Sequence, residues 1–419
     1  MTEANLASDP VWPQKSLAQL GARVTSGSRG WAKYYSDHGD LFVRITNLRR
    51  TSTRLDLSSP RYLQVDPDDA EARRTRLRPG DILISITADI GIIGLVDETV
   101  PDPAYINQHI ARVRLDPKLA DSRFISYFLA SWAPQRRFVG ATDQGAKAGM
   151  NLTAVANLTA AVPPLAEQVA IADALDTAVA QIEALECLIA KKRNTKQSLM
   201  QQLLTGRTRL PGFSDPWKEL LVSDLLEFKN GLNKASRFFG HGTPIVNFMD
   251  VMRAPVITAE RVKGLVSLSR EEIGRFAARR GDMFFTRTSE SVEEIGTAGV
   301  LVDDIPNAVF SGFVLRGRPI APVNTTFLAY QFQLPSVRKQ VIATASYTTR
   351  ALTNGGSLGR VRVLVPSTDE QAAVVAVLAD ADAELAALER RLESAQALKT
   401  GMMQELLTGR TRLPVEAAS

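Results

Sequence analysis

Arginine, lysine and side-chain amides are the groups in this sequence whose types and spacing suggest a chemical role. Arginines crowd two stretches of the first half, namely residues 44–54 and 73–78. Guanidinium groups bind phosphates, arginine pairs with guanine, and asparagine or glutamine pairs with adenine. Such local clusters on a chain with 50 basic and 45 acidic residues are expected of a DNA-binding protein. A solvated basic surface explains the same clusters, so composition alone does not separate the two interpretations.

Catalytic motifs are missing from the sequence. It contains no Gly-Lys dipeptide and therefore no P-loop for ATP, and no glycine-rich loop that suggests an S-adenosylmethionine site. Its three histidines (His38, His109, His241) and Cys187 are too far apart in sequence for a usual zinc site. The segment Val162-Pro163-Pro164-Leu165 lacks the polar and aromatic residues that an amino-methyltransferase motif requires. We expect no catalytic residue, no metal site and no cofactor on this chain.

Composition places the protein among ordinary globular chains. Hydrophobic residues make up 45% of 419 residues, and the longest apolar runs are too short to cross a bilayer. The N-terminus, Met1–Asn5, is acidic and polar, unlike a signal peptide. A single cysteine rules out an internal disulfide and fits a reducing compartment. We therefore expect a cytoplasmic protein with no membrane partner.

An internal repeat organises the chain. The stretch Gln201-Gln-Leu-Leu-Thr-Gly-Arg-Thr-Arg-Leu-Pro211 recurs 203 residues later, from Gln404 to Pro414, with one change. The match continues back through the preceding segment, and Pro79-Gly80-Asp81 is echoed by Arg280-Gly281-Asp282. The chain is therefore a tandem duplication. We expect two variable domains, each followed by a similar helix, with boundaries at residues 1–160, 161–210, 211–365 and 366–414.

The two similar segments have the spacing of long helices. Apolar residues recur every seven positions for over four heptads in both copies, which is typical of a coiled coil, although two ordinary core helices remain an alternative. Prolines precede each segment, and Gly206 or Gly409 follows it. The expected interface residues are Leu175, Ile182, Leu185, Ile189, Leu199, Leu378, Leu385, Leu388, Leu392 and Met402.

The variable domains have mixed α/β character. Residues 41–45, 111–115 and 361–365 alternate between apolar and polar side chains, as strands do, and Ile125–Trp132 has helical spacing. We predict an α/β (α+β) fold, with two domains on helices that form an antiparallel coiled coil.

Candidate DNA contacts lie in basic or amide-rich stretches near glycines. In the first domain these are Arg29, Lys33, Arg44, Asn47, Arg49, Arg50, Arg54, Gln144, Lys147 and Asn151. In the second domain they are Lys234, Arg237, Asn247, Arg253, Arg287, Arg350 and Asn354. For each of them, a solvated surface role competes with a base or phosphate contact.

The duplicated helix with Pro164-Leu165-Ala166-Glu167-Gln168 at its start and Gln201–Gly206 at its end resembles the type I restriction–modification specificity subunits. The resemblance covers essentially the whole chain, although the second copy departs at its start, Pro366–Gln371. It implies a non-catalytic subunit whose two domains read the two halves of a gapped site in double-stranded DNA. It also implies partners: two N6-adenine methyltransferase subunits and a restriction–translocase subunit, with S-adenosylmethionine and ATP bound there.

Three other functions compete with this one. A DNA-binding scaffold of the same fold without a methyltransferase differs in its neighbouring gene. A self-contained methyltransferase or nuclease needs the motifs that are missing. A purely structural coiled-coil protein leaves the arginine-rich domains unexplained and predicts no salt-dependent DNA affinity.

Overall fold

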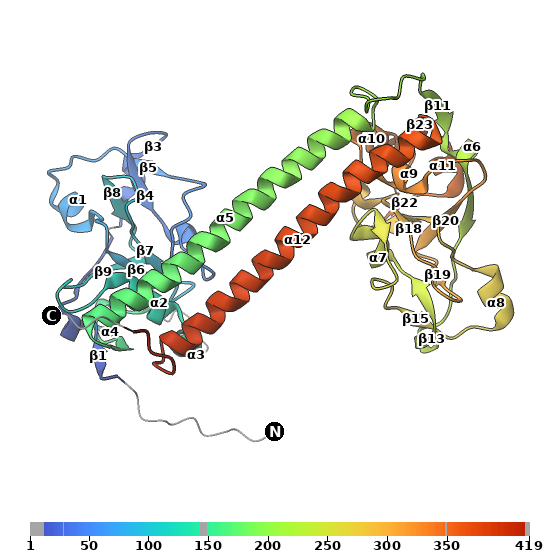
Figure 1. The fold of residues 1–419 in the computed structure, drawn as a ribbon. Helices are drawn as coiled ribbons and strands as arrows, with labels where there is room; N and C mark the ends of the chain where they lie inside the picture. Colours follow the sequence, from blue (N-terminus) through green and yellow to red (C-terminus); the bar gives the residue numbers. More distant parts are fainter. Residues whose placement is uncertain (1–11, 28, 143–148, 348–349, 415–419) are drawn as a thin grey trace. The chain divides into compact units, whose positions relative to one another are not determined.

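The computed structural model describes residues 12–27, 29–142, 149–347 and 350–414. The chain forms two compact units (Figure 1). Unit 1 comprises residues 1–186 and 390–419, and unit 2 comprises residues 187–389. Each unit contains one sheet-rich domain together with part of each of two long helices. The boundaries fall after Glu186 and Glu389, which are equivalent positions in the 203-residue repeat.

Unit 1 is built from two four-stranded sheets, with orders β2-β9-β6-β7 and β3-β5-β4-β8, and the pair β1-β10. Its strands are β1 (Gln14–Ser16), β2 (Arg23–Ser26), β3 (Tyr35–Ser36), β4 (Asp40–Val43), β5 (Tyr62–Leu63), β6 (Ile82–Ser85), β7 (Ile93–Leu95), β8 (Ala104–Ile106), β9 (Ile110–Arg114) and β10 (Thr159–Ala161). Its shorter helices are α1 (Ala70–Thr75), α2 (Ser122–Ala130), α3 (Trp132–Thr142) and α4 (Leu152–Ala156), with 3-10 turns η1 (Ala18–Leu20), η2 (Trp31–Tyr34) and η3 (Ile45–Asn47).

Unit 2 repeats this plan with additions. Its main sheet, β12-β20-β16-β18-β14, keeps the order of the first sheet of unit 1 and gains β14 at one edge. Its strands are β11 (Lys218–Leu221), β12 (Leu226–Asn230), β13 (Phe239–Val246), β14 (Val256–Ile257), β15 (Leu265–Val266), β16 (Met283–Thr286), β17 (Thr288–Ser289), β18 (Ala298–Leu301), β19 (Val309–Phe310), β20 (Val314–Pro319), β21 (Ser346–Tyr347), β22 (Ala351–Leu352) and β23 (Arg362–Val365). Its helices are α6 (Val222–Leu225), α7 (Phe248–Met252), α8 (Arg270–Arg275), α9 (Thr325–Gln331), α10 (Pro335–Ala343) and α11 (Gly355–Gly359), with η4 (Ser236–Phe238) and η5 (Val292–Glu294).

The central strands are buried on both faces. Ile82 and Ile84 of β6 pack into one apolar cluster, and Leu83 between them packs into another. In β16, Met283 and Phe285 face one cluster and Phe284 faces a second. Because neighbouring side chains of a strand point to opposite faces, each domain has a core on both sides of its main sheet.

One predicted strand is shorter than its alternating pattern. The sequence predicts a strand over residues 41–45, but β4 ends at Val43 and Ile45–Asn47 forms a 3-10 turn. The reason is local: the Arg44 backbone N–H donates to Asn47 Oδ1 at 2.9 Å, which closes the turn. Side-chain amides compete with strand pairing in this way.

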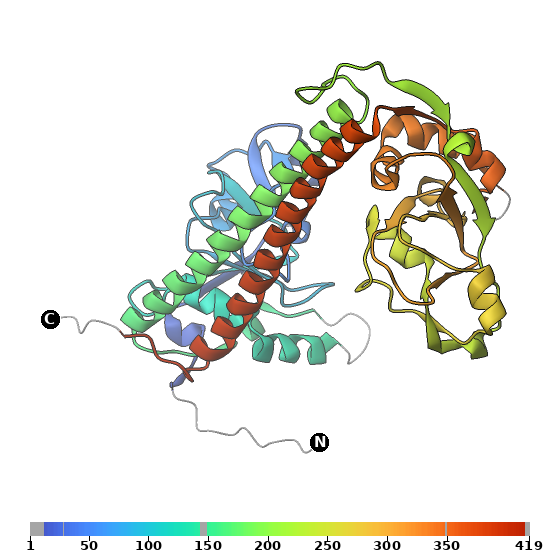
Figure 2. The same ribbon diagram turned by 45° about the vertical axis from the view of Figure 1, so that its right-hand side comes forward.

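The long helices are α5 (Leu165–Leu203) and α12 (Thr368–Leu406), each of 39 residues. Within unit 2 Arg193 pairs with Glu389 and Lys196, one turn later, with Asp382, so the two helices run antiparallel. Figures 1 and 2 show them side by side. The predicted α/β fold with paired long helices is therefore confirmed. No helix within the described ranges is long and apolar enough to span a membrane.

Candidate nucleic-acid interface

A buried aspartate–arginine pair stabilises each domain. Asp81 is fully buried and accepts two bonds from Arg114, at 2.7 and 2.6 Å. Asp282 accepts two from Arg318, both at 2.7 Å. Each carboxylate also accepts a 2.8 Å bond from a backbone N–H three residues earlier. The Gly-Asp repeat in the sequence therefore marks framework residues rather than DNA contacts.

Four segments of unit 1 meet along one side of the domain through backbone hydrogen bonds. Gly27 N–H donates to the Asn107 carbonyl at 3.2 Å, Ile86 N–H to His109 at 2.9 Å, and Met150 N–H to Ile86 at 2.9 Å. We call this surface the loop edge of unit 1; it consists of residues 26–34 (other than 28), 86–90, 107–109 and 149–151.

Unit 2 contains the same arrangement. Gly312 N–H donates to the Leu232 carbonyl at 2.7 Å, Arg287 N–H to Phe313 at 3.0 Å, and Thr353 N–H to Arg287 at 3.0 Å. The loop edge of unit 2 consists of residues 230–238, 287–290, 311–313, 346–347 and 350–354. In each unit, backbone hydrogen bonds thus join segments that the sequence singled out separately; these segments include Arg29, Lys33, Asn151, Lys234, Arg237, Arg287, Arg350 and Asn354. Gln144 and Lys147 lie outside the described residues.

An exposed cation rests on an aromatic ring at the same place in both loop edges. Lys33 Nζ lies 4.7 Å from the centroid of the Tyr34 ring, and Arg237 Cζ lies 5.0 Å from that of Phe238. Both cations are exposed, and the next residues, Tyr35 and Phe239, are 46% and 37% exposed. The sequence analysis missed these aromatics, although the repeat carried the signal: Lys-Tyr-Tyr and Arg-Phe-Phe occupy the same place in each copy.

Other predicted cations already have acidic partners. Arg49 pairs with Asp56, Arg50 with Asp89, and Arg54 with Glu183 at 2.7 Å. Hydrogen bonds from Ser58, and then from Arg49, lower the pKa of Asp56 to about 2. Lys234 contacts both carboxylate oxygens of Glu272, at 2.5 and 2.6 Å, and Arg350 lies 3.5 Å from Glu290.

Three further predicted arginines have other surroundings. Arg253 is exposed at the end of α7, Arg287 is half-buried, and Arg44 donates to the Ser59 carbonyl at 3.3 Å.

The predicted amides shape the loops. Asn151 and Asn354 are equivalent N-caps, which accept from Ala154 N–H at 2.8 Å and Ser357 N–H at 2.9 Å. Asn47 is buried in its turn and also donates to the Asp56 carbonyl at 2.7 Å. Asn247 is half-buried and donates to the Ile245 carbonyl at 3.2 Å. Caps of this kind set the path of the backbone next to the exposed cations.

Known proteins share this architecture over nearly the whole chain. Residues 72–191 match the family described as Type I restriction modification DNA specificity domain. The Type I restriction enzyme EcoKI specificity subunit of Escherichia coli K12 is 26% identical over 413 residues, which cover 95% of this chain and 87% of that protein. The putative type I restriction enzyme MjaX specificity subunit of Methanocaldococcus jannaschii is 23% identical and covers 48% of each chain.

Over nearly its whole length, this chain is similar to a type I restriction–modification specificity subunit. Solved structures share its fold. The S subunit from M. genitalium aligns with a TM-score of 0.60 at 15% identity, over 96% of this chain and 98% of that one. A chain from a structural study of complex assembly and conformational transition of the type I R-M system aligns with a TM-score of 0.56 at 19% identity, over the same shares.

In this chain, the duplicated helix-end motif forms an ion pair in each unit. Arg412, beyond α12, binds both carboxylate oxygens of Glu167 at the start of α5. Arg209, beyond α5, binds Glu370 at the start of α12 at 2.5 and 2.7 Å, and Trp217 Nε1 donates to the same carboxylate at 3.1 Å. Both glutamates are 1% exposed. The repeated Thr-Gly-Arg-Thr-Arg-Leu-Pro segment is therefore explained by an ion pair between a partly exposed arginine and a buried glutamate, which joins the end of one helix to the start of the other.

The predicted helix-interface residues lie on the inward side of both helices. Six of them are buried and four are half-buried. The buried ones are Leu175, Leu185, Ile189, Leu378, Leu385 and Leu388, and the half-buried ones are Ile182, Leu199, Leu392 and Met402. Leu175 and Leu378 also belong to the domain cores, so the helices are anchored to the domains as well as to each other.

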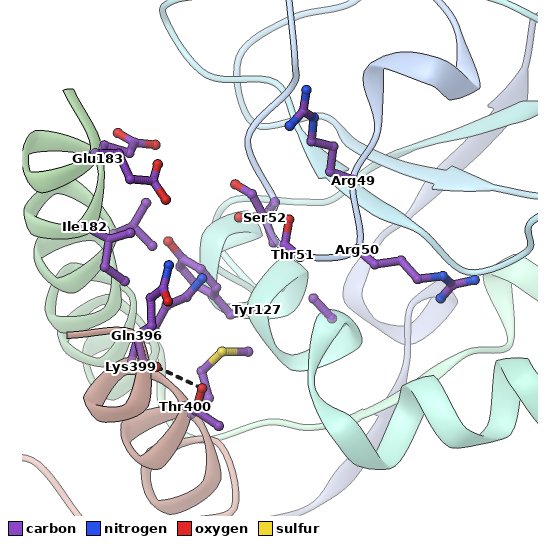
Figure 3. A pocket seen from close by; sticks show the side chains of 15 residues that line it. Arg49, Arg50, Thr51, Ser52, Tyr127, Ile182, Glu183, Gln396, Lys399 and Thr400 are labelled. Carbon is purple, nitrogen blue, oxygen red and sulfur yellow. Dashed lines mark hydrogen bonds between the residues drawn. The ribbon is translucent and has the colours of Figure 1, made fainter. Parts of the chain in front are cut away.

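The lysines that interrupt the heptads, Lys196 and Lys399, have different surroundings. Lys196 pairs with Asp382, which also accepts from the Tyr330 hydroxyl at 2.6 Å. At the position of unit 1 equivalent to Asp382 stands Val179. Lys399 and Val179 line a cleft of about 550 Å³, between the loop Arg49–Thr53 and the helices (Figure 3). Burial lowers the pKa of Lys399, against the attraction of Glu183 and Glu186.

Methionine at these two lysine positions is expected to change stability in opposite directions. Lys196→Met leaves Asp382 without its cation and should lower the free energy of unfolding by about 3 kcal/mol. Lys399→Met removes a cation that burial disfavours, and it should raise the free energy of unfolding by about 1 kcal/mol. Denaturant unfolding measures the free energy of unfolding of both variants. A change in the same direction for both would contradict the different surroundings of the two lysines.

The Lys399 effect should also depend on pH. Because the folded-state pKa lies below the ordinary lysine value of 10.5, the folded state binds fewer protons than the unfolded state between these two pKa values. The free-energy cost of burying the charged Lys399 side chain is greatest below the folded-state pKa and decreases as the pH rises toward 10.5. The stability advantage of Lys399→Met should therefore shrink in alkaline solution.

Within the described ranges, no group of three or more His, Cys, Asp or Glu side chains could hold a metal ion.

Proposed function

We propose that this subunit reads a two-part, gapped site in double-stranded DNA, one part with the loop edge of each unit. The observation that carries the proposal is the repeated exposed cation on an aromatic ring, Lys33 on Tyr34 and Arg237 on Phe238, on two edges that share two equivalent backbone hydrogen bonds. Cations bind phosphates, whereas the side chains around them read the bases. Because those side chains differ between the units, the two half-sites should differ.

The proposal includes the other subunits of the complex. We infer that residues 1–160 and 211–365 act as target-recognition domains and that the helical segments 161–210 and 366–414 serve as spacer. Two methyltransferase subunits would dock, because the helix junction occurs twice with the same ion pair. A restriction–translocase subunit would join them. S-adenosylmethionine and ATP would be bound on these partners, in the cytoplasm.

The first experiment tests whether DNA methylation at a gapped motif depends on this chain. The subunit is co-expressed with its adjacent methyltransferase gene, and N6-methyladenine is mapped across the host genome. A gapped motif that disappears when this chain is omitted supports the proposal, and methylation that does not need the chain contradicts it.

Replacing residues 12–160 with the corresponding domain of a relative should then change one half-site and leave the other intact. A change in both half-sites would show that the domains do not read independently. If the purified complex forms but methylates nothing, a DNA-binding scaffold without methyltransferase function becomes the better description.

A further inference from the structure

One turn lies at the centre of each loop edge, and it carries different chemistry in the two units. In unit 1 it is Asn107-Gln108-His109, between β8 and β9; in unit 2 it is Ser311-Gly312-Phe313, between β19 and β20. The backbone is held in the same way in both, since the carbonyls of His109 and Phe313 accept from Ile86 and Arg287. The same scaffold therefore presents an amide in one unit and a phenyl ring in the other.

Hydrogen bonds hold the Gln108 amide in one orientation. Gln108 Nε2 lies 2.9 Å from His109 Nε2, and His109 Nδ1 lies 2.6 Å from Thr87 Oγ1. An amide nitrogen only donates, so His109 Nε2 accepts and its Nδ1–H donates to Thr87. Among the described residues, no hydrogen bond engages the Gln108 carbonyl oxygen or its second N–H. One acceptor and one donor remain, the pair that matches N6–H and N7 of adenine in the major groove.

Phe313 offers an apolar surface instead. Its side chain is 60% exposed, unusual for a phenylalanine next to a buried strand. A Cβ at position 312 would lie 2.1 Å from Asn233 Oδ1, so any residue other than glycine requires the Asn233 side chain to move. The turn projects the ring over a hollow of about 290 Å³ that is lined also by Phe248, Arg350, Glu290 and Glu294. The apolar feature that DNA displays in the major groove is the thymine methyl group.

We propose that this turn determines specificity in both units: Gln108 reads an adenine in one half-site, and Phe313 contacts a thymine methyl group in the other. The inference rests on the proposed function and adds the residues and bases to it. The loop edge supplies the phosphate contacts on the same surface, through Lys33 and Arg237.

The first test compares Phe313→Ala with Ile320→Ala, in the full complex with methyltransferase. Ile320 is a matched control: it lies just beyond the other end of β20 and is also 60% exposed. Phe313→Ala should make one position of one half-site degenerate, with discrimination reduced about 4-fold, the value expected for one buried methyl group, and leave the other half-site unchanged. Ile320→Ala should leave the motif intact. An unchanged motif in Phe313→Ala, with normal complex formation, overturns the inference.

Deoxyuridine tests the methyl contact itself, since it differs from thymidine only by that group. Substituting it at the degenerate position should weaken binding of the wild type and not of Phe313→Ala. Equal binding of both DNAs by the wild type would overturn the thymine assignment. Phe313→Leu keeps an apolar side chain and should retain part of the preference.

A separate control variant tests the proposal that Gln108 reads an adenine. Gln64 bonds His38 at 3.0 Å in an exposed pair outside the Asn107–His109 turn, and its backbone N–H donates to the Tyr34 carbonyl at 2.9 Å. Gln108→Ala should relax an adenine position in the other half-site, whereas Gln64→Ala should not. If the wild type itself gives no two-part motif, the proposed function fails. If it gives one that Gln108→Ala and Phe313→Ala leave intact, only this inference fails.

Discussion

Arg412→Met is expected to destabilise unit 1, and by more than a change at an exposed arginine of the same segment, because it leaves the buried Glu167 carboxylate without its cation. Glu167 is 1% exposed and receives two bonds from the Arg412 guanidinium, which also lies 5.9 Å from the centroid of the Trp12 ring. Hydrogen exchange measured peptide by peptide should show faster exchange across unit 1, with unit 2 less affected.

Arg410 provides the control in the same segment. It lies 3.8 Å from Glu405, and both side chains are about half exposed. Arg410→Met should therefore change the free energy of unfolding by less than about 1 kcal/mol. Glu167→Gln combined with Arg412→Met should recover part of the loss, since a neutral amide costs less to bury than a charge. Equal effects of Arg410→Met and Arg412→Met would show that the junction is not held by this ion pair.

Lengthening both long helices by one heptad is expected to abolish methylation at the wild-type motif. The antiparallel pairing requires insertions in both, after Glu186 and after Glu389, so that each unit keeps its own helix contacts. Seven residues add about 10 Å of helix, the length of about three base pairs. Three base pairs also turn the DNA by about three-tenths of a helical turn, so the second half-site would face another direction.

A variant with the insertion in α5 alone distinguishes an effect on the spacing of the half-sites from a loss of folding. Inserting the heptad in α5 alone shifts Lys196 and Arg193 away from Asp382 and Glu389, and should destabilise unit 2. The double insertion should remain folded and methylate either a site with a different gap or no site. An unchanged gap in a folded double-insertion variant would show that the helices do not set the spacing.

Much of the fold follows from local pattern in the sequence. The 203-residue repeat, the 39-residue helices and the buried strands were all predictable, because heptad spacing, flanking prolines and glycines, and apolar runs depend on neighbours in the chain. The repeat also separates framework from variable surface: Glu167 and Glu370 recur because they make the same buried contact in both units.

The candidate site depends on tertiary structure. Arg49, Arg54 and Lys234 look the same in the sequence as Lys33 and Arg237, but the first three form ion pairs with carboxylates, whereas neither of the last two has an ion pair among the described residues. Lys196 and Lys399 occupy one repeat position, yet only Lys196 has an aspartate opposite. The loop edges bring together segments up to about 120 residues apart. Sequence by itself determined the duplicated architecture, because periodicity is local. Only the folded chain decided which charges and rings remain exposed, because that depends on partners distant in sequence.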